Sequence, residues 1–264
     1  MKRISLFTCF TAFIITIYAQ SYPKQENTIR VMSYNIQNGK GIDNVTDYQR
    51  IADVVANIAP DVVALQELDS VTNRSKGVDA LEQLARLTAM YQVYGASINY
   101  DGGKYGIGVL SKEKPRSWKR IPLPGREEAR SLLLVEFKDY VFGCTHFSLN
   151  ADDRLTSVEI IDRAVKDFGK PVILAGDINA TPRTPVIEAF RQNWAVLSDT
   201  AKMTFPSDKP SGTIDYIFGY KPKGFTYSVW QTLVPNTQAS DHLPLFADIR
   251  LKAAKNAIKT RRSS

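Results

Sequence analysis

The chain has 264 residues, of which 44% are hydrophobic and 10% aromatic, enough to bury one sizeable core. Length alone does not exclude two smaller cores in place of one. The formal net charge of +7 is concentrated at the two ends, in Lys2, Arg3, Lys252, Lys255, Lys259, Arg261 and Arg262. The body between them is near neutral, which argues against a basic groove for nucleic acid and favours a solvated basic tail.

The first segment has the pattern of an export signal. Residues 1–19 combine two basic residues with an uncharged stretch from Ile4 to Ala19, which is shorter than a bilayer-spanning helix. We predict a cleaved signal peptide, with an uncleaved membrane anchor as the alternative. Once this segment is removed, Cys144 is the only cysteine, so no internal disulfide can form and a packed core must stabilise the exported domain.

One domain is predicted over residues 20–251, with a basic tail at 252–264, because no repeat or flexible linker interrupts it. Its first half alternates strands and helices. A strand is expected at 29–36, and Thr46–Gln49 has the pattern of a capping box before an amphipathic helix that ends at Pro60. Strands follow at 62–68 and 105–111, separated by a helix whose apolar face contains Leu81, Leu84 and Leu87.

The second half contains more strands. Segments 130–137 and 140–147 predict an antiparallel hairpin that turns near Lys138 and Asp139. A helix follows, with an apolar face formed by Leu155, Val158, Ile161, Val165 and Phe168. Further strands are expected at 171–178, 213–220 and 243–251. This pattern predicts an α/β fold in which two sheets pack face to face and helices cover them.

Several apolar runs are closed or preceded by polar residues that suit metal-assisted phosphoester chemistry. These residues are Asn35, Glu67, His146, Asp177, Asn179, Asp215, Asp241 and His242. Taken singly, each has an ordinary structural explanation as a surface carboxylate, a turn residue or a core histidine. Asp215 is the exception, because it lies between Ile214 and Tyr216 and needs a buried partner. Both histidines of the chain lie beside such clusters, which favours one cleft at the strand ends.

The residue types also match what phosphoester hydrolysis requires. Glu67 and Asp241 offer the hard oxygen ligands that a divalent cation prefers. A histidine oriented by a carboxylate can take a proton from water near neutral pH. Asn179 and a second histidine can donate to the charge that develops on the phosphoryl oxygens.

The motifs YNIQ, LQEL, THF, GDIN, IDYIF and SDH occur in this order within residues 29–250. Together they resemble the endonuclease/exonuclease/phosphatase superfamily. The resemblance implies a four-layer α/β/β/α sandwich of two mixed β-sheets flanked by helices, with the site at one edge of the sheets. It also implies Mg²⁺, with Mn²⁺ as the alternative, bound by Glu67 with Asn35 nearby and Asp241 in contact directly or through water.

The resemblance implies roles for the other residues. His242 would activate the attacking water while Asp215 holds its imidazole. Asp177 and Asn179 would orient the nucleophile and hydrogen-bond the phosphate.

His146 would donate to a phosphate or leaving-group oxygen, and Arg130 would reach the substrate phosphate. Gln37 occupies a position where many relatives have an acid, which favours a site with one metal ion. Asn179-Ala-Thr181 is also an N-glycosylation sequon, so a eukaryotic secretory route would risk a sugar on a site residue.

These features predict an exported hydrolase, periplasmic or secreted and bacterial, that cleaves a small or lipid-linked phosphoester. A secreted deoxyribonuclease-like endonuclease with nucleic acid as its substrate is the first alternative, and the near-neutral body argues against it. A non-catalytic binding domain on the same fold is the second. We expect a monomer with no obligate protein partner.

Overall fold

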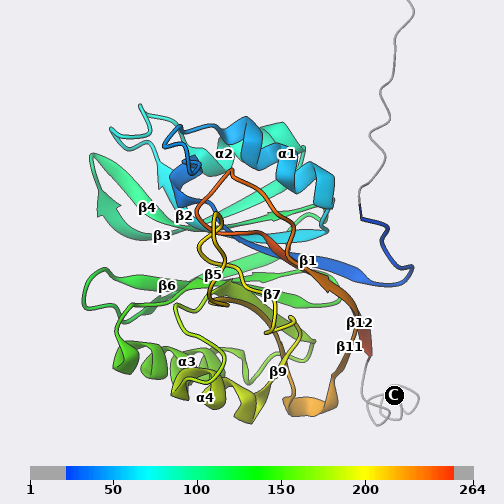
Figure 1. The fold of residues 1–264 in the computed structure, drawn as a ribbon. Helices are drawn as coiled ribbons and strands as arrows, with labels where there is room; N and C mark the ends of the chain where they lie inside the picture. Colours follow the sequence, from blue (N-terminus) through cyan, green and yellow to red (C-terminus); the bar gives the residue numbers. More distant parts are fainter. Residues whose placement is uncertain (1–21, 253–264) are drawn as a thin grey trace, which may run out of the picture.

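A computed structural model of the chain describes residues 22–252, so the expected signal segment 1–19 and all but the first residue of the tail 252–264 lie outside the described residues. Two six-stranded mixed sheets pack face to face, and a pair of helices covers the outer surface of each (Figure 1). The predicted four-layer sandwich is therefore confirmed. None of the described helices is long and apolar enough to cross a membrane.

The first sheet is built mainly from the N-terminal half of the chain. Its strands lie in the order β11 (Thr226–Leu233), β12 (Leu245–Lys252), β1 (Ile29–Asn35), β2 (Val62–Ser70), β4 (Gly103–Ser111) and β3 (Tyr91–Tyr100). Helices α1 (Tyr48–Ile58) and α2 (Ala80–Thr88) cover its outer face. The short 3₁₀ turn η1 (Gln37–Gly39) follows β1.

The second sheet comes from the middle of the chain. Its order is β5 (Ser117–Leu123), β6 (Arg130–Glu136), β7 (Val141–His146), β8 (Val172–Asp177), β10 (Asp215–Tyr220) and β9 (Trp194–Val196). Helices α3 (Ala151–Val165) and α4 (Pro185–Asn193) cover its outer face, and the 3₁₀ turn η2 (Pro222–Gly224) precedes β11. Strands β6 and β7 form the expected antiparallel hairpin.

Three apolar clusters hold the four layers together. One lies between the sheets and includes Val31, Leu133 and Phe142, and the other two lie between each sheet and its helices. Central strands are thus buried on both faces, which explains why they are continuous apolar runs in the sequence rather than alternating ones. Each fully buried aliphatic or aromatic side chain contributes about 1.5–3 kcal/mol.

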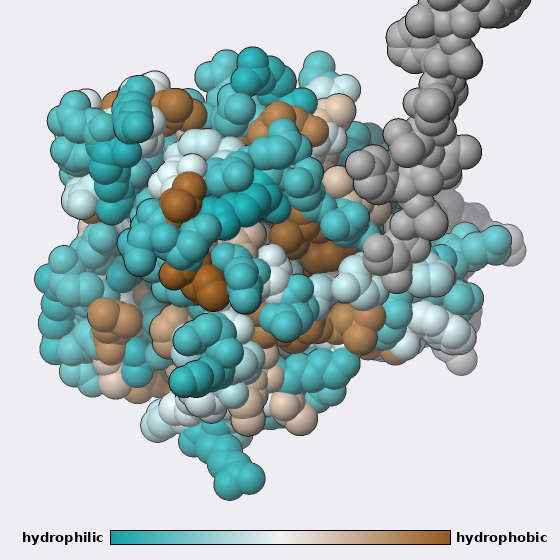
Figure 2. Space-filling model, turned by 45° about the horizontal axis from the view of Figure 1, so that its top comes forward, coloured by the Kyte–Doolittle hydropathy of each residue, from teal (hydrophilic) through white to brown (hydrophobic). Residues whose placement is uncertain are grey.

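All eight predicted strands are present, and four others were not predicted: β3, β5, β9 and β11. Each of these four lies at an edge of its sheet. An edge strand has only one neighbouring strand and is partly open to water. Trp118 in β5 is 63% exposed, and Trp230 in β11 is 66% exposed. Figure 2 shows a largely hydrophilic face on which apolar residues are scattered. Helix α4 was also not predicted.

Two helix ends differ from the expectation. Asp47, not Thr46, caps α1, because its carboxylate accepts hydrogen bonds from the backbone N–H groups of Gln49 and Arg50. Asp47 satisfies two of the first unpaired N–H groups, as a capping residue does. In the third predicted helix Val158, Ile161 and Val165 are buried, but Phe168 lies beyond the end of α3.

The topology brings the polar strand ends to one edge. Strands β1 and β2 are parallel neighbours in one sheet, and β7 and β8 are parallel neighbours in the other. β10 runs antiparallel to β8, so β10 begins where β8 ends, and β12 begins likewise beside the end of β1. Strand β1 packs across the sandwich against β8 and β10. Residues that end some strands and begin others therefore converge.

Candidate active site

Three functional side chains lie next to one another on adjacent strands of the second sheet. Asp177 ends β8, His146 is its register partner at the end of β7, and Asp215 is its partner at the start of β10. All three are buried, with Asp177 and Asp215 each only 1% exposed. The residue before Asp177 has to be a glycine, because a Cβ at Gly176 would lie 2.1 Å from the carbonyl oxygen of Thr145.

His242 joins this group from the loop before β12. Its Nδ1 lies 3.0 Å from Oδ2 of Asp215, and its Nε2 lies 3.7 Å from Oδ2 of Asp177. The ring of Phe205 packs on the imidazole with centroids 4.7 Å apart. Since a carboxylate only accepts, the Nδ1 proton belongs to this pair and Nε2 faces the cluster. Asp215 thus has the buried partner that its apolar surroundings required.

The charges of the cluster act on one another strongly. Burial lowers the pKa of His242, but the charge and hydrogen bond of Asp215 and the charges of Asp177 and Asp241 outweigh it and raise the pKa to about 10. Burial and the negative charge of Asp215 raise the pKa of Asp177 to about 7, against the opposing effects of His242 and two hydrogen bonds. Two carboxylates and one imidazole therefore compete for protons in a buried space.

The sequence predicted Glu67 at the end of a strand, but the residue lies inside β2, which continues to Ser70. Residues Leu65 and Leu68 pair with Gly108 and Gly106, so two residues of β2 face a single residue of β4 and form a β-bulge. Glu67 has a left-handed φ of 62° at this bulge. Such backbone strain in a non-glycine residue costs of the order of 1–3 kcal/mol and is concentrated at functional sites. The bulge changes the direction of the carboxylate partway along the strand.

Asn35 links Glu67 to the catalytic cluster. Its amide nitrogen donates to Oε1 of Glu67 at 2.9 Å and to Oδ2 of Asp177 at 3.2 Å. Its amide oxygen accepts from the backbone N–H of Gln37 at 3.1 Å, which fixes the orientation of the group. Asn35 therefore holds two carboxylates together, and in this arrangement it presents nitrogen rather than oxygen to them.

Asn179 is part of a turn and also lies in the site. Its φ is 52°, its backbone N–H donates to Oδ1 of Asp177 at 2.8 Å, and its side-chain nitrogen donates to the carbonyl of Phe147 at 2.9 Å. The bond to Asp177 is that of an Asx turn and fixes its carboxylate, whereas the bond to Phe147 ties the turn to the end of the neighbouring strand β7. Asp241 is half-buried, and the hydroxyl of Ser240 bridges it to the Asn35 carbonyl at 3.3 and 2.8 Å.

Arg130 begins β6 and lies against His146. Its Nη1 is 3.2 Å from Nδ1 of His146 and 3.1 Å from Glu128, and its Nη2 is 3.2 Å from Glu127. Burial, the positive charge of Arg130 and the charge of His242 hold the pKa of His146 well below its usual range. Sequence reasoning did not select Glu127, Glu128 or Ser240; the run EEAR before β6 was the signal for the first two.

The donor set fits a divalent cation. Within the described part of the chain, ligand atoms of Asp177, Asp215 and His242 lie within 4.8 Å of one another, and Oδ1 of Asp215 is buried with no hydrogen-bond partner. Through Asn35, the carboxylate of Glu67 lies beside this group. Buried carboxylates at such separations are stabilised by an added cation, and their oxygens are the ligands that Mg²⁺ takes.

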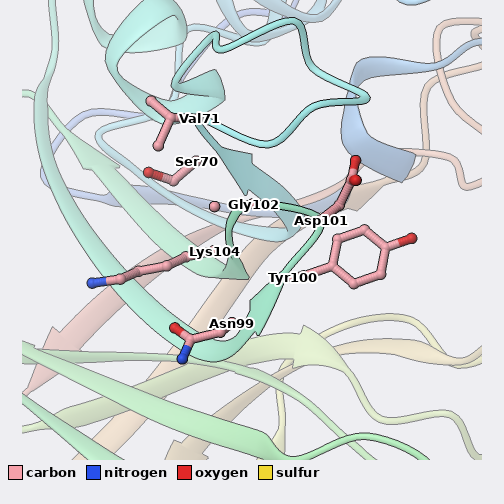
Figure 3. A pocket seen from close by; sticks show the side chains of 8 residues that line it. Ser70, Val71, Asn99, Tyr100, Asp101, Gly102 and Lys104 are labelled. Carbon is pink, nitrogen blue, oxygen red and sulfur yellow. The ribbon is translucent and has the colours of Figure 1, made fainter.

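An open pocket of about 670 Å³ lies in the first sheet where β2 ends and β3 turns into β4. In Figure 3 Ser70 and Val71 lie on one side of this opening, and Asn99 and Lys104 lie on the other. Tyr100 lines the pocket, and the guanidinium of Arg74 lies 4.5 Å from its ring. The pocket is lined by none of the residues of the catalytic cluster.

The sequence of this chain matches the model of the endonuclease/exonuclease/phosphatase family over residues 32–242. The chain is a member of this family. Members of the endonuclease/exonuclease/phosphatase family are generally phosphoester hydrolases that depend on a divalent metal, and the buried Asp–Asp–His group is compatible with that chemistry. A search of curated protein sequences found no match to the chain.

Solved structures share the fold of this family member at low sequence identity. An endonuclease/exonuclease/phosphatase from Bacteroides vulgatus is 19% identical with a TM-score of 0.71, over 85% of this chain and 99% of that one. The mannosyl-6-phosphatase of Bacteroides thetaiotaomicron is 18% identical with a TM-score of 0.67, over 84% and 99%. The human Nocturnin catalytic domain with bound sulfate is 19% identical with a TM-score of 0.67, over 86% and 94%.

Proposed function

We propose that this chain is an exported phosphoester hydrolase, periplasmic or secreted, that requires Mg²⁺, with Mn²⁺ as the alternative. Its substrate is a small or lipid-linked phosphoester, and it acts as a monomer. The observation that carries the proposal is the buried Asp215–His242 pair, whose free imidazole nitrogen faces Asp177 beside His146. One structural neighbour is named a mannosyl-6-phosphatase and another has sulfate bound, which supports the reaction class only.

Each residue has a role that follows from its contacts. In its neutral form His242 accepts a proton from the attacking water at Nε2, and Asp215 holds the ring through Nδ1 and stabilises the resulting imidazolium. Because the surrounding carboxylates raise the pKa of His242 to about 10, the neutral form requires added positive charge beside them near neutral pH, which a bound cation would supply. Asp177, fixed by the N–H of Asn179 and the amide of Asn35, orients that water. His146 donates to an oxygen of the phosphoryl group.

Glu67 and Asp241 would hold the cation, with Asn35 keeping Glu67 in place. When bound, the cation supplies positive charge that offsets the clustered carboxylates and the charge developing on the phosphoryl oxygens. The remainder of the substrate would occupy the pocket beside Tyr100.

The test is hydrolysis by the mature protein in Mg²⁺. The substrates are aryl phosphodiesters, sugar phosphates, inositol phosphates, sphingomyelin, plasmid DNA and RNA. We expect turnover of a small or lipid-linked ester that chelation abolishes and that His242→Ala and Asp177→Ala reduce by about 10²–10⁴-fold. Asp139→Asn, in the exposed β6–β7 turn at the opposite end of the sheet, is the matched control.

Turnover that survives chelation, or full activity of His242→Ala, would refute the proposed mechanism. Cleavage of DNA or RNA alone, falling steeply with salt, would replace the small-ester assignment with a nuclease. For export, the proposal predicts loss of residues 1–19, which mass spectrometry of protein from the cell exterior or periplasm would detect. An intact N-terminus on membranes would indicate the uncleaved anchor instead.

A further inference from the structure

We propose that Arg130 is a positioning residue: it fixes the tautomer of His146, so that this histidine acts as a neutral hydrogen-bond donor from Nε2 rather than as a general acid. The inference rests on the proposed phosphoester hydrolysis. It departs from the role that the sequence resemblance implied, in which Arg130 reaches the substrate phosphate.

The guanidinium of Arg130 is already engaged by the protein. Nη1 is hydrogen-bonded to Nδ1 of His146 at 3.2 Å and forms an ion pair with a carboxylate oxygen of Glu128 at 3.1 Å, while Nε is buried without a hydrogen-bond partner. Nη2 donates to Glu127 at 3.2 Å, and the side chain is only 8% exposed. Two carboxylates beside one guanidinium offset the positive charge that a phosphate would meet.

The contact with His146 determines where the ring proton lies. A guanidinium has five N–H donors and no acceptor, so Nδ1 of His146 must accept from Arg130. The single proton of the neutral ring is then on Nε2. That nitrogen is 3.5 Å from Oδ2 of Asp177 and faces the space that this carboxylate shares with His242. In this state His146 offers a hydrogen bond to an oxygen in that space.

Glu127 keeps Arg130 in this orientation. Its carboxylate accepts from the backbone N–H of Leu149 and from the hydroxyl of Ser148, each at 2.8 Å. Burial raises the pKa of Glu127, but these hydrogen bonds and that of Arg130 outweigh it and lower the pKa to about 2. A charged, anchored carboxylate thus connects the segment before β6 to the turn after β7, and Arg130 spans the two.

The first test reads the tautomer without any substrate. In the metal-free protein carrying ¹⁵N-histidine, long-range ¹H–¹⁵N spectra should show His146 as the Nε2–H form at neutral pH. Arg130→Met, Arg130→Lys and Glu127→Gln should each move the His146 nitrogens towards a mixture of tautomers. Arg126→Gln, an exposed arginine of the same segment, should leave them unchanged. A wild-type Nδ1–H form, or unchanged signals in all three variants, would overturn the proposal.

The second test separates positioning from phosphate binding. We expect Arg130→Lys to reduce kcat by about 10–100-fold, as loss of one oriented donor does, with KM and the Kd of inorganic phosphate changed by less than about 3-fold. In a His146→Ala background the same substitution should have little further effect, because it acts through His146. A large rise in KM and in the phosphate Kd, additive with His146→Ala, would show that Arg130 binds phosphate.

The two tests fail independently. If no phosphoester is hydrolysed, the proposed function fails, while the ¹⁵N spectra still decide the tautomer. Glu127→Gln preserves the size of the side chain, so it remains informative if a substitution of Arg130 prevents folding. A folded Glu127→Gln variant with wild-type tautomer and wild-type kcat would count against the proposal.

Discussion

Replacing Asp215 by asparagine tests the central pair of the site. Asparagine keeps the size of the side chain and an acceptor oxygen, but it removes the negative charge that lies 3.0 Å from Nδ1 of His242. Burial lowers the pKa of His242, and Asp215 is the largest of the influences that raise it to about 10. Without that charge we expect the pKa of His242 to fall to about its ordinary 6.5 or below.

The size of the effect follows from the pKa. Each pKa unit is worth about 1.4 kcal/mol, so a rise from 6.5 to about 10 corresponds to about 5 kcal/mol of net stabilisation of the imidazolium. Because the folded-state pKa is raised, this stabilisation of the fold is complete below about pH 6.5 and is lost as pH rises through about 10. In Asp215→Asn the stability should depend much less on pH across that window. We also expect kcat to fall by about 10²–10⁴-fold, since the base loses its orienting partner.

The assay is an NMR titration of the metal-free protein. The chain has only two histidines, so His146→Gln assigns both ring signals. Asp139→Asn, an exposed acid in the β6–β7 turn, is the matched control and should leave the His242 titration unchanged. A wild-type His242 that titrates near 6.5, or an unchanged titration in Asp215→Asn, would refute the electrostatic reasoning.

Three further outcomes are expected. Glu67→Gln should weaken Mg²⁺ binding by more than about 10-fold, and thermal shifts with Mg²⁺ would measure it; an unchanged shift would place the cation elsewhere. Asp248→Asn should cost about 3–5 kcal/mol in urea unfolding, because it leaves the fully buried guanidinium of Arg30 unpaired. Burial would raise the pKa of Asp248, but Arg30 lowers it, so the stability from this pair is present above about pH 4 and lost in acid; a flat acid profile would contradict this. Cys144, whose pKa burial raises to about 12, should resist thiol reagents at pH 8 until the protein unfolds, and rapid labelling of the folded protein would be the contrary result.

The secondary structure that the sequence predicted is the part buried on both sides. Strands such as β1, β2 and β8 are continuous apolar runs because a sheet lies on one face and helices lie on the other. Strands β5 and β11 have exposed faces and mixed composition, and only their pairing with β6 and β12 makes them strands. Edge pairing depends on the neighbouring strand rather than on local apolar pattern, so sequence periodicity did not detect it.

The sequence allowed the residues of the candidate site to be proposed as a set, because polar side chains at the ends of apolar strands have few structural reasons to recur. Their geometry was not. At the β-bulge two residues of β2 lie opposite one residue of β4, and this redirects the Glu67 side chain from the direction it would have in a regular strand. Glu127 and Glu128 were not selected, because acidic residues are common in polar surface segments. Their role is seen only in the structure, where Arg130 lies between these acids and a histidine.

The family, the central strands and the types of group available for chemistry can be read from the amino-acid sequence. Which of these groups contact one another is seen only in the folded chain. Asn35 reaches Asp177 across 142 positions of the chain, and His242 reaches Asp215 across 27. Arg130 contacts His146 rather than an open phosphate site. Such contacts depend on the register of strands in two sheets and on the packing between the sheets, which no local pattern of residues specifies.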